Sequence, residues 1–109
     1  MSDYTDFLQV EIHTGTITAA RRHPRARKPA YILTVDFGVL GMKTSSAQLT
    51  VNYTAEELVG RQIIAVTNFP PKHIAGVKSE VLILGAVDEE RDVVLLTPTF
   101  AVADGTRIL

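Results

Sequence analysis

The densest group of candidate functional residues lies in the segment NFPPKHIAGVKSE, residues 68–80. Pro70 and Pro71 fix two backbone φ angles, which lowers the entropy of the free loop and the cost of ordering it around a ligand. Gly76 permits a positive φ or a close backbone approach. The pattern predicts a stiffened binding loop, whose candidate peptide-binding residues are Asn68, Phe69, Pro70, Pro71, Ile74, Gly76, Lys78, Ser79 and Glu80.

A second interpretation of this loop is purely structural. Phe69 and Ile74 are then core residues, and the two prolines only end a strand. For Phe69 alone we favour the core, because aromatic residues at strand ends usually pack inward. The charges of Lys72, Lys78 and Glu80 are most simply explained as solvated groups of little energetic consequence, with Lys78 the best candidate among them for ligand contact.

A second polar segment, KTSSAQ, covers residues 43–48. Ser45, Ser46 and Gln48 make a strand polar on both faces, and such a strand must meet water or a ligand because burying unpaired polar groups is costly. We predict that they line a groove in which an extended peptide is held by backbone hydrogen bonds, with Gln48 and Asn68 each offering a donor and an acceptor. The alternative is a solvated edge strand protected by Lys43.

Basic residues are concentrated in RRHPRARK, residues 21–28, which holds five of the eleven Lys and Arg residues although the net charge is −1. If the ligand were RNA, phosphate contacts would come from basic side chains and Phe69 could stack on a base. These basic candidates are Arg21, Arg22, Arg25, Arg27, Lys43, Lys72 and Lys78. The low aromatic content, 6% without tryptophan, weighs against a single-strand binder, and a solvated basic loop is the simpler explanation.

The sequence offers few residues from which an active site could be built. There is no cysteine, and His13, His23 and His73 lack a partner at a spacing typical of a metal site or a catalytic triad. Asp36, Phe37 and Gly38 spell the DFG of protein kinases, but the other kinase motifs are missing. We therefore expect neither an enzyme nor a cofactor.

Hydrophobic alternation predicts the elements that position these segments. Strands are expected at about 10–19, with a bulge at Gly15 where the apolar parity flips, and at 31–37, 42–49 and 62–69. A short helix at 54–60 is predicted from the capping box of Thr54 and Glu57. Residues 81–87 and 93–97 complete a hairpin around an acidic turn. The order predicts one all-β domain over residues 1–109, a five-stranded Greek-key OB-fold barrel with short helices and an additional C-terminal hairpin.

The hairpin carries Val93, Val94, Leu95 and Leu96, which are apolar on both faces. A homodimer would cover the second face; the alternative is that a first helix at about 4–8 covers it within one chain. The acidic N-terminal residues do not resemble a secretory signal, and no apolar run is long enough to span a membrane. We therefore expect a cytoplasmic protein.

The chain resembles the tRNA-binding domain family over nearly its whole length. The resemblance is carried by residues 11–38 and by the motifs KTSSAQ, NFPPKHIAGVKSEVLILG, VVLLTP and DGTRI. That family includes C-terminal parts of bacterial methionyl-tRNA synthetases. SSAQ and NFPP are typical of its CsaA branch of export chaperones. The resemblance implies a homodimer that binds unfolded or pre-secretory polypeptides in clefts and helps them reach the Sec translocation motor. It favours the groove interpretation of Ser45, Ser46 and Gln48, while a freestanding tRNA-binding module remains the alternative.

Overall fold

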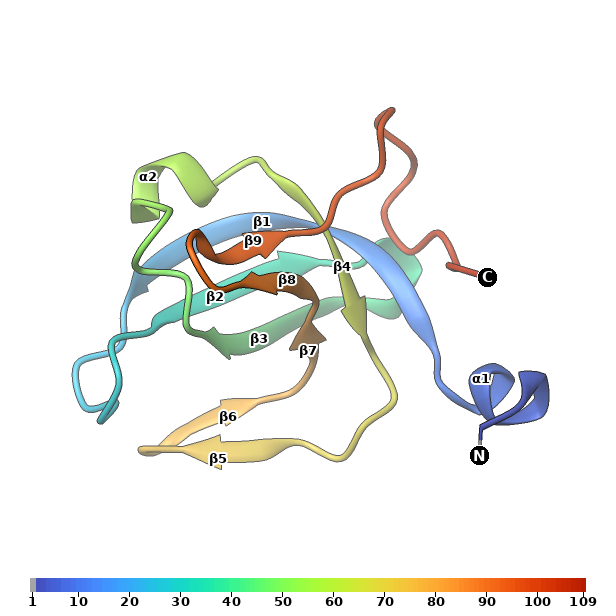
Figure 1. Cartoon of the computed structure of the whole chain (residues 1–109), viewed down its shortest axis with the longest axis horizontal. Coiled ribbons are helices and arrows are strands. Elements are labelled where there is room, and N and C mark those ends of the chain that lie inside the picture. The colour runs from blue at the N-terminus through green and yellow to red at the C-terminus, as the bar shows by residue number, and fades with distance from the viewer. Residues whose placement is uncertain (1) are drawn as a thin grey trace.

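A computed structural model describes residues 2–109 of the chain as a small, nearly closed barrel (Figure 1). Five strands form its main sheet in the order β3-β2-β1-β4-β7. Their bounds are β1 Ile12–Arg22, β2 Tyr31–Asp36, β3 Met42–Ala47, β4 Gln62–Val66 and β7 Leu82–Ile83. All four pairings are antiparallel, and the predicted OB-fold architecture is confirmed.

The barrel closes where β3 meets the residues that precede β7. The backbone N–H of Glu80 donates to the Thr44 carbonyl (2.8 Å), and the Thr44 N–H donates to a Glu80 carboxylate oxygen (3.0 Å). The hydroxyl of Ser45 donates to the carbonyl of Val81 (3.1 Å). These bonds satisfy the outer edge of β3, which would otherwise be a free sheet edge.

The long first strand bends, but at a different residue from the one predicted. Its register against β2 shifts between Ile17 and Ala19, so the irregularity lies at Thr18 and not at Gly15. Gly15 has another role, because a Cβ there would lie 2.7 Å from side-chain atoms of Val35 and Phe37. The glycine therefore lets β1 pass close over the core. The change in the apolar alternation at Gly15 reflects this close packing and not a bulge.

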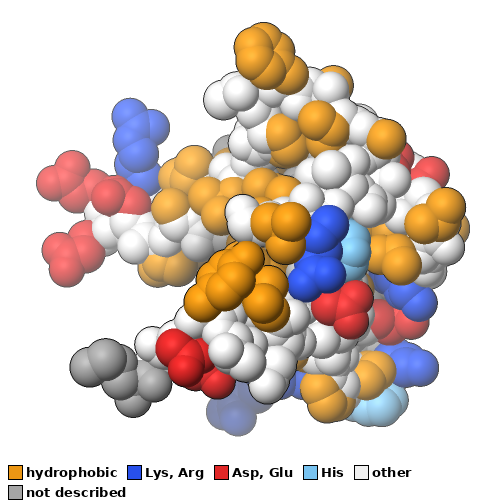
Figure 2. All heavy atoms as spheres, turned by 90° about the vertical axis from the view of Figure 1, so that its right-hand side faces the viewer, with side chains coloured by type: hydrophobic (Ala, Val, Ile, Leu, Met, Phe, Trp, Pro, Cys, Tyr) orange, Lys and Arg blue, Asp and Glu red, His pale blue; other side chains and the backbone are white. Residues whose placement is uncertain are grey.

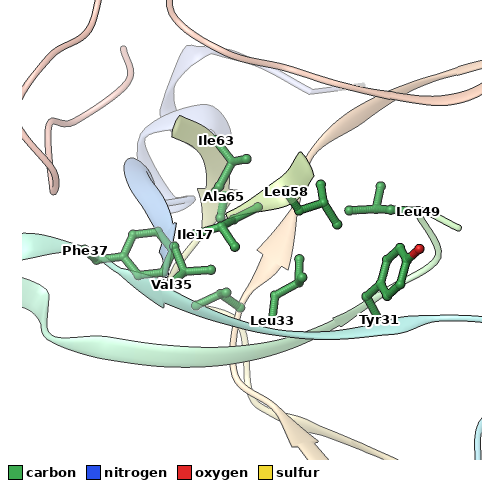
Figure 3. Packing of buried hydrophobic residues seen from close by; sticks show 10 residues of the cluster. Ile17, Tyr31, Leu33, Val35, Phe37, Leu49, Leu58, Ile63 and Ala65 are labelled. Atoms are coloured by element: carbon green, nitrogen blue, oxygen red, sulfur yellow. The ribbon is translucent and has the colours of Figure 1, made fainter. Parts of the chain in front are cut away.

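The core fills the barrel with side chains that come mostly from β1, β2 and β4, while Ala47 of β3 and Ile83 of β7 pack against it (Figure 3). Its labelled members are Ile17, Tyr31, Leu33, Val35, Phe37, Leu49, Leu58, Ile63 and Ala65. Leu58 is delivered by the short helix α2, Ala55–Leu58, which begins at the predicted capping box. The Glu57 N–H donates to the Thr54 hydroxyl (3.2 Å) and the Thr54 N–H to the Glu57 carboxylate (3.0 Å).

Two hairpins extend from the barrel. One pairs β5, Lys72–Ile74, with β6, Val77–Ser79; the other pairs β8, Gly85–Asp88, with β9, Asp92–Leu95. The predicted C-terminal hairpin is thus real, but its first arm is split, since residues 82–83 leave to pair with β4. The third and fourth strands end earlier than predicted, at Ala47 and Val66.

The chain ends are held at a distance from the β8–β9 hairpin. The first helix, α1 Tyr4–Gln9, lies well away from that hairpin in Figure 1, so the idea that it covers the hairpin within one chain is wrong. The last residues follow the first half of β1, where Gly105 N–H donates to the Thr14 carbonyl (2.8 Å) and Ile108 N–H to the Ile12 carbonyl (2.8 Å). A 3-10 turn, η1 Gly38–Leu40, packs beside this segment, where a Cβ on Gly38 would clash with the Asp104 carbonyl oxygen.

Candidate functional site

A hollow runs between the loop of residues 23–30, the end of β3 and the β5–β6 hairpin. It consists of two pockets of about 770 and 230 Å³ that share Ser46 and Ile74 in their walls. We call these two pockets together the groove. The larger pocket is also lined by Ala26, Arg27, Lys28, Ala30, Gln48 and Ala75. The smaller one is also lined by Phe69, Pro70, Lys72, Ser79, Glu80, Val81 and Leu82.

The hairpin that forms one wall is set by a two-residue turn. Ala75 and Gly76 both have positive φ, +47° and +85°, which corresponds to the type I′ turn whose twist suits an antiparallel hairpin. Side chains alternate along its strands, so Lys72 and Ile74 face the groove while His73 between them points away. Ser79 likewise lines the groove, and Lys78 beside it is exposed and outside both pockets.

The predicted proline-rich rim is partly in place. Phe69 is 45% exposed and lines the smaller pocket with Pro70, so its predicted assignment to the core is wrong. Ile74, at the junction of the two pockets, is half-buried. Pro71 and Gly76 are exposed but line neither pocket, so they contribute only through the loop and turn that they shape.

Two predicted peptide-binding side chains are engaged within the chain itself. Ser45 is 1% exposed, and its hydroxyl is bonded to the Val81 carbonyl, so it belongs to the barrel interior. The Asn68 amide donates to the Gln9 carbonyl (2.8 Å), and its oxygen accepts the Glu11 N–H (2.9 Å). Ser45 therefore offers no free polar group to a ligand, and the Asn68 amide is used to hold the segment that precedes β1.

The remaining polar groups differ in how free they are. Glu80 lines the smaller pocket, yet its carboxylate already accepts the Thr44 N–H (3.0 Å). Ser79 accepts the backbone N–H of Ser46 (3.0 Å) and so ties the hairpin to β3. Gln48 is exposed at the wall of the larger pocket, where its amide can donate and accept.

The basic loop divides between the groove and the outer surface. Arg27 lines the larger pocket, together with Lys28, which was not among the predicted site residues. Arg21 and Arg25 are exposed outside the groove, and Arg22 lies over the Tyr31 ring at 5.6 Å from its centroid. Lys43 lines a separate hollow of about 210 Å³ with Asn68. The predicted RNA-binding residues therefore do not line one common pocket.

Several groove residues were missed by the sequence prediction. The small apolar walls come from Ala26, Ala30 and Ala75, and a larger apolar part comes from Val81 and Leu82. Alanines in a basic loop carry no sequence signal of their own, and they reach the groove only because the loop folds back onto the hairpin. Among residues 2–109, no three His, Cys, Asp or Glu side chains gather closely enough to hold a metal ion.

Comparison with known proteins identifies the family. A model described as "Putative tRNA binding domain" matches residues 12–107. The chain belongs to the tRNA-binding domain family.

Within the tRNA-binding domain family, the chain is similar over its full length to solved structures of CsaA chaperones. A chaperone CsaA from Bacillus anthracis is 53% identical with a TM-score of 0.95, over 100% of this chain and 99% of that one. A CsaA chaperone protein from Picrophilus torridus is 46% identical with a TM-score of 0.95, over the whole of both chains. The predicted resemblance to the CsaA branch of the tRNA-binding domain family is therefore confirmed.

Methionine–tRNA ligases carry the same tRNA-binding domain as a small part of a longer protein. The ligase of Porphyromonas gingivalis is 33% identical over 96% of this chain, which spans only 15% of that enzyme.

Within residues 2–109 of the present chain, no helix is long and apolar enough to cross a membrane.

Proposed function

We propose that this protein is a molecular chaperone that holds unfolded or pre-secretory polypeptides in the groove, and that it is not an enzyme. The observation that carries the proposal is the groove itself, in which apolar walls and free polar groups lie side by side in two adjoining pockets that share Ser46 and Ile74. The similarity to CsaA chaperones over full length supports it.

The composition of the groove suits a ligand of variable sequence. Phe69, Ile74 and Leu82 offer apolar contacts to side chains, which gain affinity from buried area without requiring one residue type. Gln48 can bond the backbone amides that every polypeptide has. Such a site captures extended chain rather than a folded surface.

The test is equilibrium binding of a denatured pre-protein, followed by fluorescence anisotropy at moderate salt. We expect binding that is nearly insensitive to salt, because apolar contacts dominate. The proposal fails if denatured pre-proteins do not bind while tRNA does.

A second candidate is a freestanding tRNA-binding module. It is favoured by the matched family model and by the exposed Arg21, Arg22, Arg25 and Arg27. Phosphate-driven binding loses affinity steeply with salt, by about 0.7 to 0.9 logarithmic units per contacted phosphate and per tenfold change in salt. A flat salt curve for tRNA, or no binding, would exclude this candidate.

We further propose that the chaperone acts in the cytoplasm as a homodimer and delivers clients to the Sec translocation motor. Support for the dimer comes from apolar side chains left on the surface, among them Val87 on β8, which is 83% exposed. Figure 2 shows further hydrophobic side chains gathered on the face that carries α1 and the C-terminal end. Capture of the purified motor by client-loaded protein, compared with unloaded protein, would test the delivery step.

A further inference from the structure

His23 directly follows Arg22, the last residue of β1, and is only 8% exposed. Its backbone N–H donates to the Ala30 carbonyl (2.9 Å), which closes the 23–30 loop. Its ring lies between that loop and the β5–β6 hairpin, with Nε2 at 2.8 Å from the Ile74 carbonyl oxygen and Nδ1 at 3.1 Å from the backbone nitrogen of Arg25. One side chain thus joins the two walls.

The partners of the ring define its tautomer. A carbonyl oxygen can only accept a hydrogen bond, so Nε2 carries the proton and donates to Ile74. The Arg25 N–H can only donate, so Nδ1 is unprotonated and accepts. Both ring nitrogens of His23 are therefore used, one for the local turn of the loop and one for the link across to the hairpin.

The hairpin needs such a link because β5 and β6 form a two-stranded sheet of their own. Isolated two-stranded hairpins are marginally stable in water. At its base the hairpin is tied to β3 through Ser79 and Glu80. Nearer its tip, the bond from His23 reaches the backbone of Ile74, the residue shared by both pockets.

We propose that His23 is a positioning residue that fixes the spacing between the 23–30 loop and the β5–β6 hairpin, and thereby the width of the groove. The inference rests on the proposed function in so far as the groove binds polypeptide. His23 needs no contact with the ligand. It keeps the walls in place before binding, so that little ordering cost falls on the complex.

Two substitutions separate the two bonds of the ring. In His23→Gln the side-chain amide nitrogen can take the position of Nε2 and keep the link to Ile74. In His23→Asn the side-chain oxygen can take the position of Nδ1 and keep the local turn, but the amide is too short to reach Ile74. A role confined to the loop is served better by Asn, and a role in groove width is served better by Gln.

We expect the affinity for a denatured pre-protein to fall about three- to tenfold in H23N and to stay within about twofold of wild type in H23Q, the range expected for one net hydrogen bond. The thermal midpoints of both variants are measured alongside. Equal affinity in H23N and wild type, or an equal loss in both variants, would overturn the proposal.

Two measurements test the positioning role of His23 without any ligand. Amide hydrogen exchange of Val77 and Ser79, in the hairpin, should speed up in H23N and not in H23Q, and nitrogen NMR of the imidazole should show the Nε2–H tautomer. Unchanged hairpin exchange in H23N, or the other tautomer, would overturn the positioning role. If wild-type protein binds no polypeptide while exchange and tautomer come out as expected, the proposed function fails and the positioning of the hairpin by His23 stands.

Discussion

Ile74 is the side chain on which the groove depends most. It is half-buried and lines both pockets, so a polypeptide bound in either pocket would meet it. Its backbone carbonyl meanwhile holds the bond to His23. A single residue thus contributes apolar contact area through its side chain and wall position through its main chain.

Ile74→Ala tests this contribution. We expect the affinity for a denatured pre-protein to fall about tenfold, because roughly 1 to 2 kcal/mol of apolar burial is lost on binding. Val77→Ala is the matched control, since Val77 is also half-buried in this hairpin but lines neither pocket. An equal loss in both variants, measured by anisotropy, would mean that the hairpin matters only as a whole.

His13, near the start of β1, is a second buried histidine, and its ring affects the stability of the fold. Its Nδ1 lies 2.8 Å from the Thr67 hydroxyl, which itself donates to the Glu11 carbonyl (3.2 Å), so the hydroxyl accepts from Nδ1–H. Burial, and then the positive charge of Arg107, lower the pKa of His13 below its ordinary value of 6.5. The folded state therefore favours the neutral ring.

This lowered pKa has a consequence for unfolding. Below about pH 6.5 the unfolded chain takes up a proton at His13 that the folded chain resists, so the free energy of unfolding must fall as the pH falls. In His13→Asn this contribution is missing. Urea unfolding of both proteins from about pH 7.5 to about pH 5.5 should show the wild-type advantage shrinking with acid; an advantage that grows would contradict the assignment.

At the scale of elements, the β5–β6 hairpin combines a fitting turn type with an unusual residue. The type I′ turn requires positive φ at both central positions, where Asn-Gly is preferred, and Ala75 adopts φ +47° although it has a Cβ. Gly76 meets no such difficulty, and a Cβ placed on it would meet nothing within 4 Å. The conformation of each residue can therefore be tested without a steric clash.

Ala75→Asn should stabilise the hairpin by about 0.5 kcal/mol, because Asn tolerates the left-handed region better than Ala. Gly76→Ala should destabilise it by about 1 kcal/mol, because it places a Cβ at φ +85°. The readout is amide hydrogen exchange of Val77, at the start of β6. Changes of the same sign in both variants would contradict a type I′ turn.

The elements also show what the sequence could predict. Local patterns were sufficient for the OB-fold order and for the capping box of Thr54 and Glu57, whose partners lie within one turn. Interactions across the chain were not predictable, because Asn68 meets Gln9 and Ser45 meets Val81 only once the barrel closes. Gly15 misled for the same reason, since its close neighbours Val35 and Phe37 belong to another strand.

At the scale of the whole molecule, apolar surface remains on the β8–β9 hairpin. Val93 and Leu95 pack against the core, whereas Val87 and Leu96 are exposed. A second copy that covers these side chains would give the molecule two grooves, and simultaneous use of both by one long client would strengthen binding without new contacts.

Sedimentation equilibrium tests the dimer. We expect twice the mass of one chain for wild type and a shift toward the single-chain mass for Val87→Asp, because a buried unpaired charge is costly. Val39→Asp tests the other apolar face, since Val39 is 97% exposed on η1, which packs beside the C-terminal segment. Dissociation by V39D with an intact V87D dimer would place the interface elsewhere.

The most direct test of polypeptide binding in the groove is NMR mapping of backbone amides during titration with an unlabelled unfolded polypeptide. The predicted result is that shifts concentrate at residues 26–30, 46–48 and 69–82, with amides of the β8–β9 hairpin and of η1 little changed beyond any dimer effect. Shifts that spare the groove and cluster on another face, or a spectrum unchanged at saturating polypeptide, would contradict it.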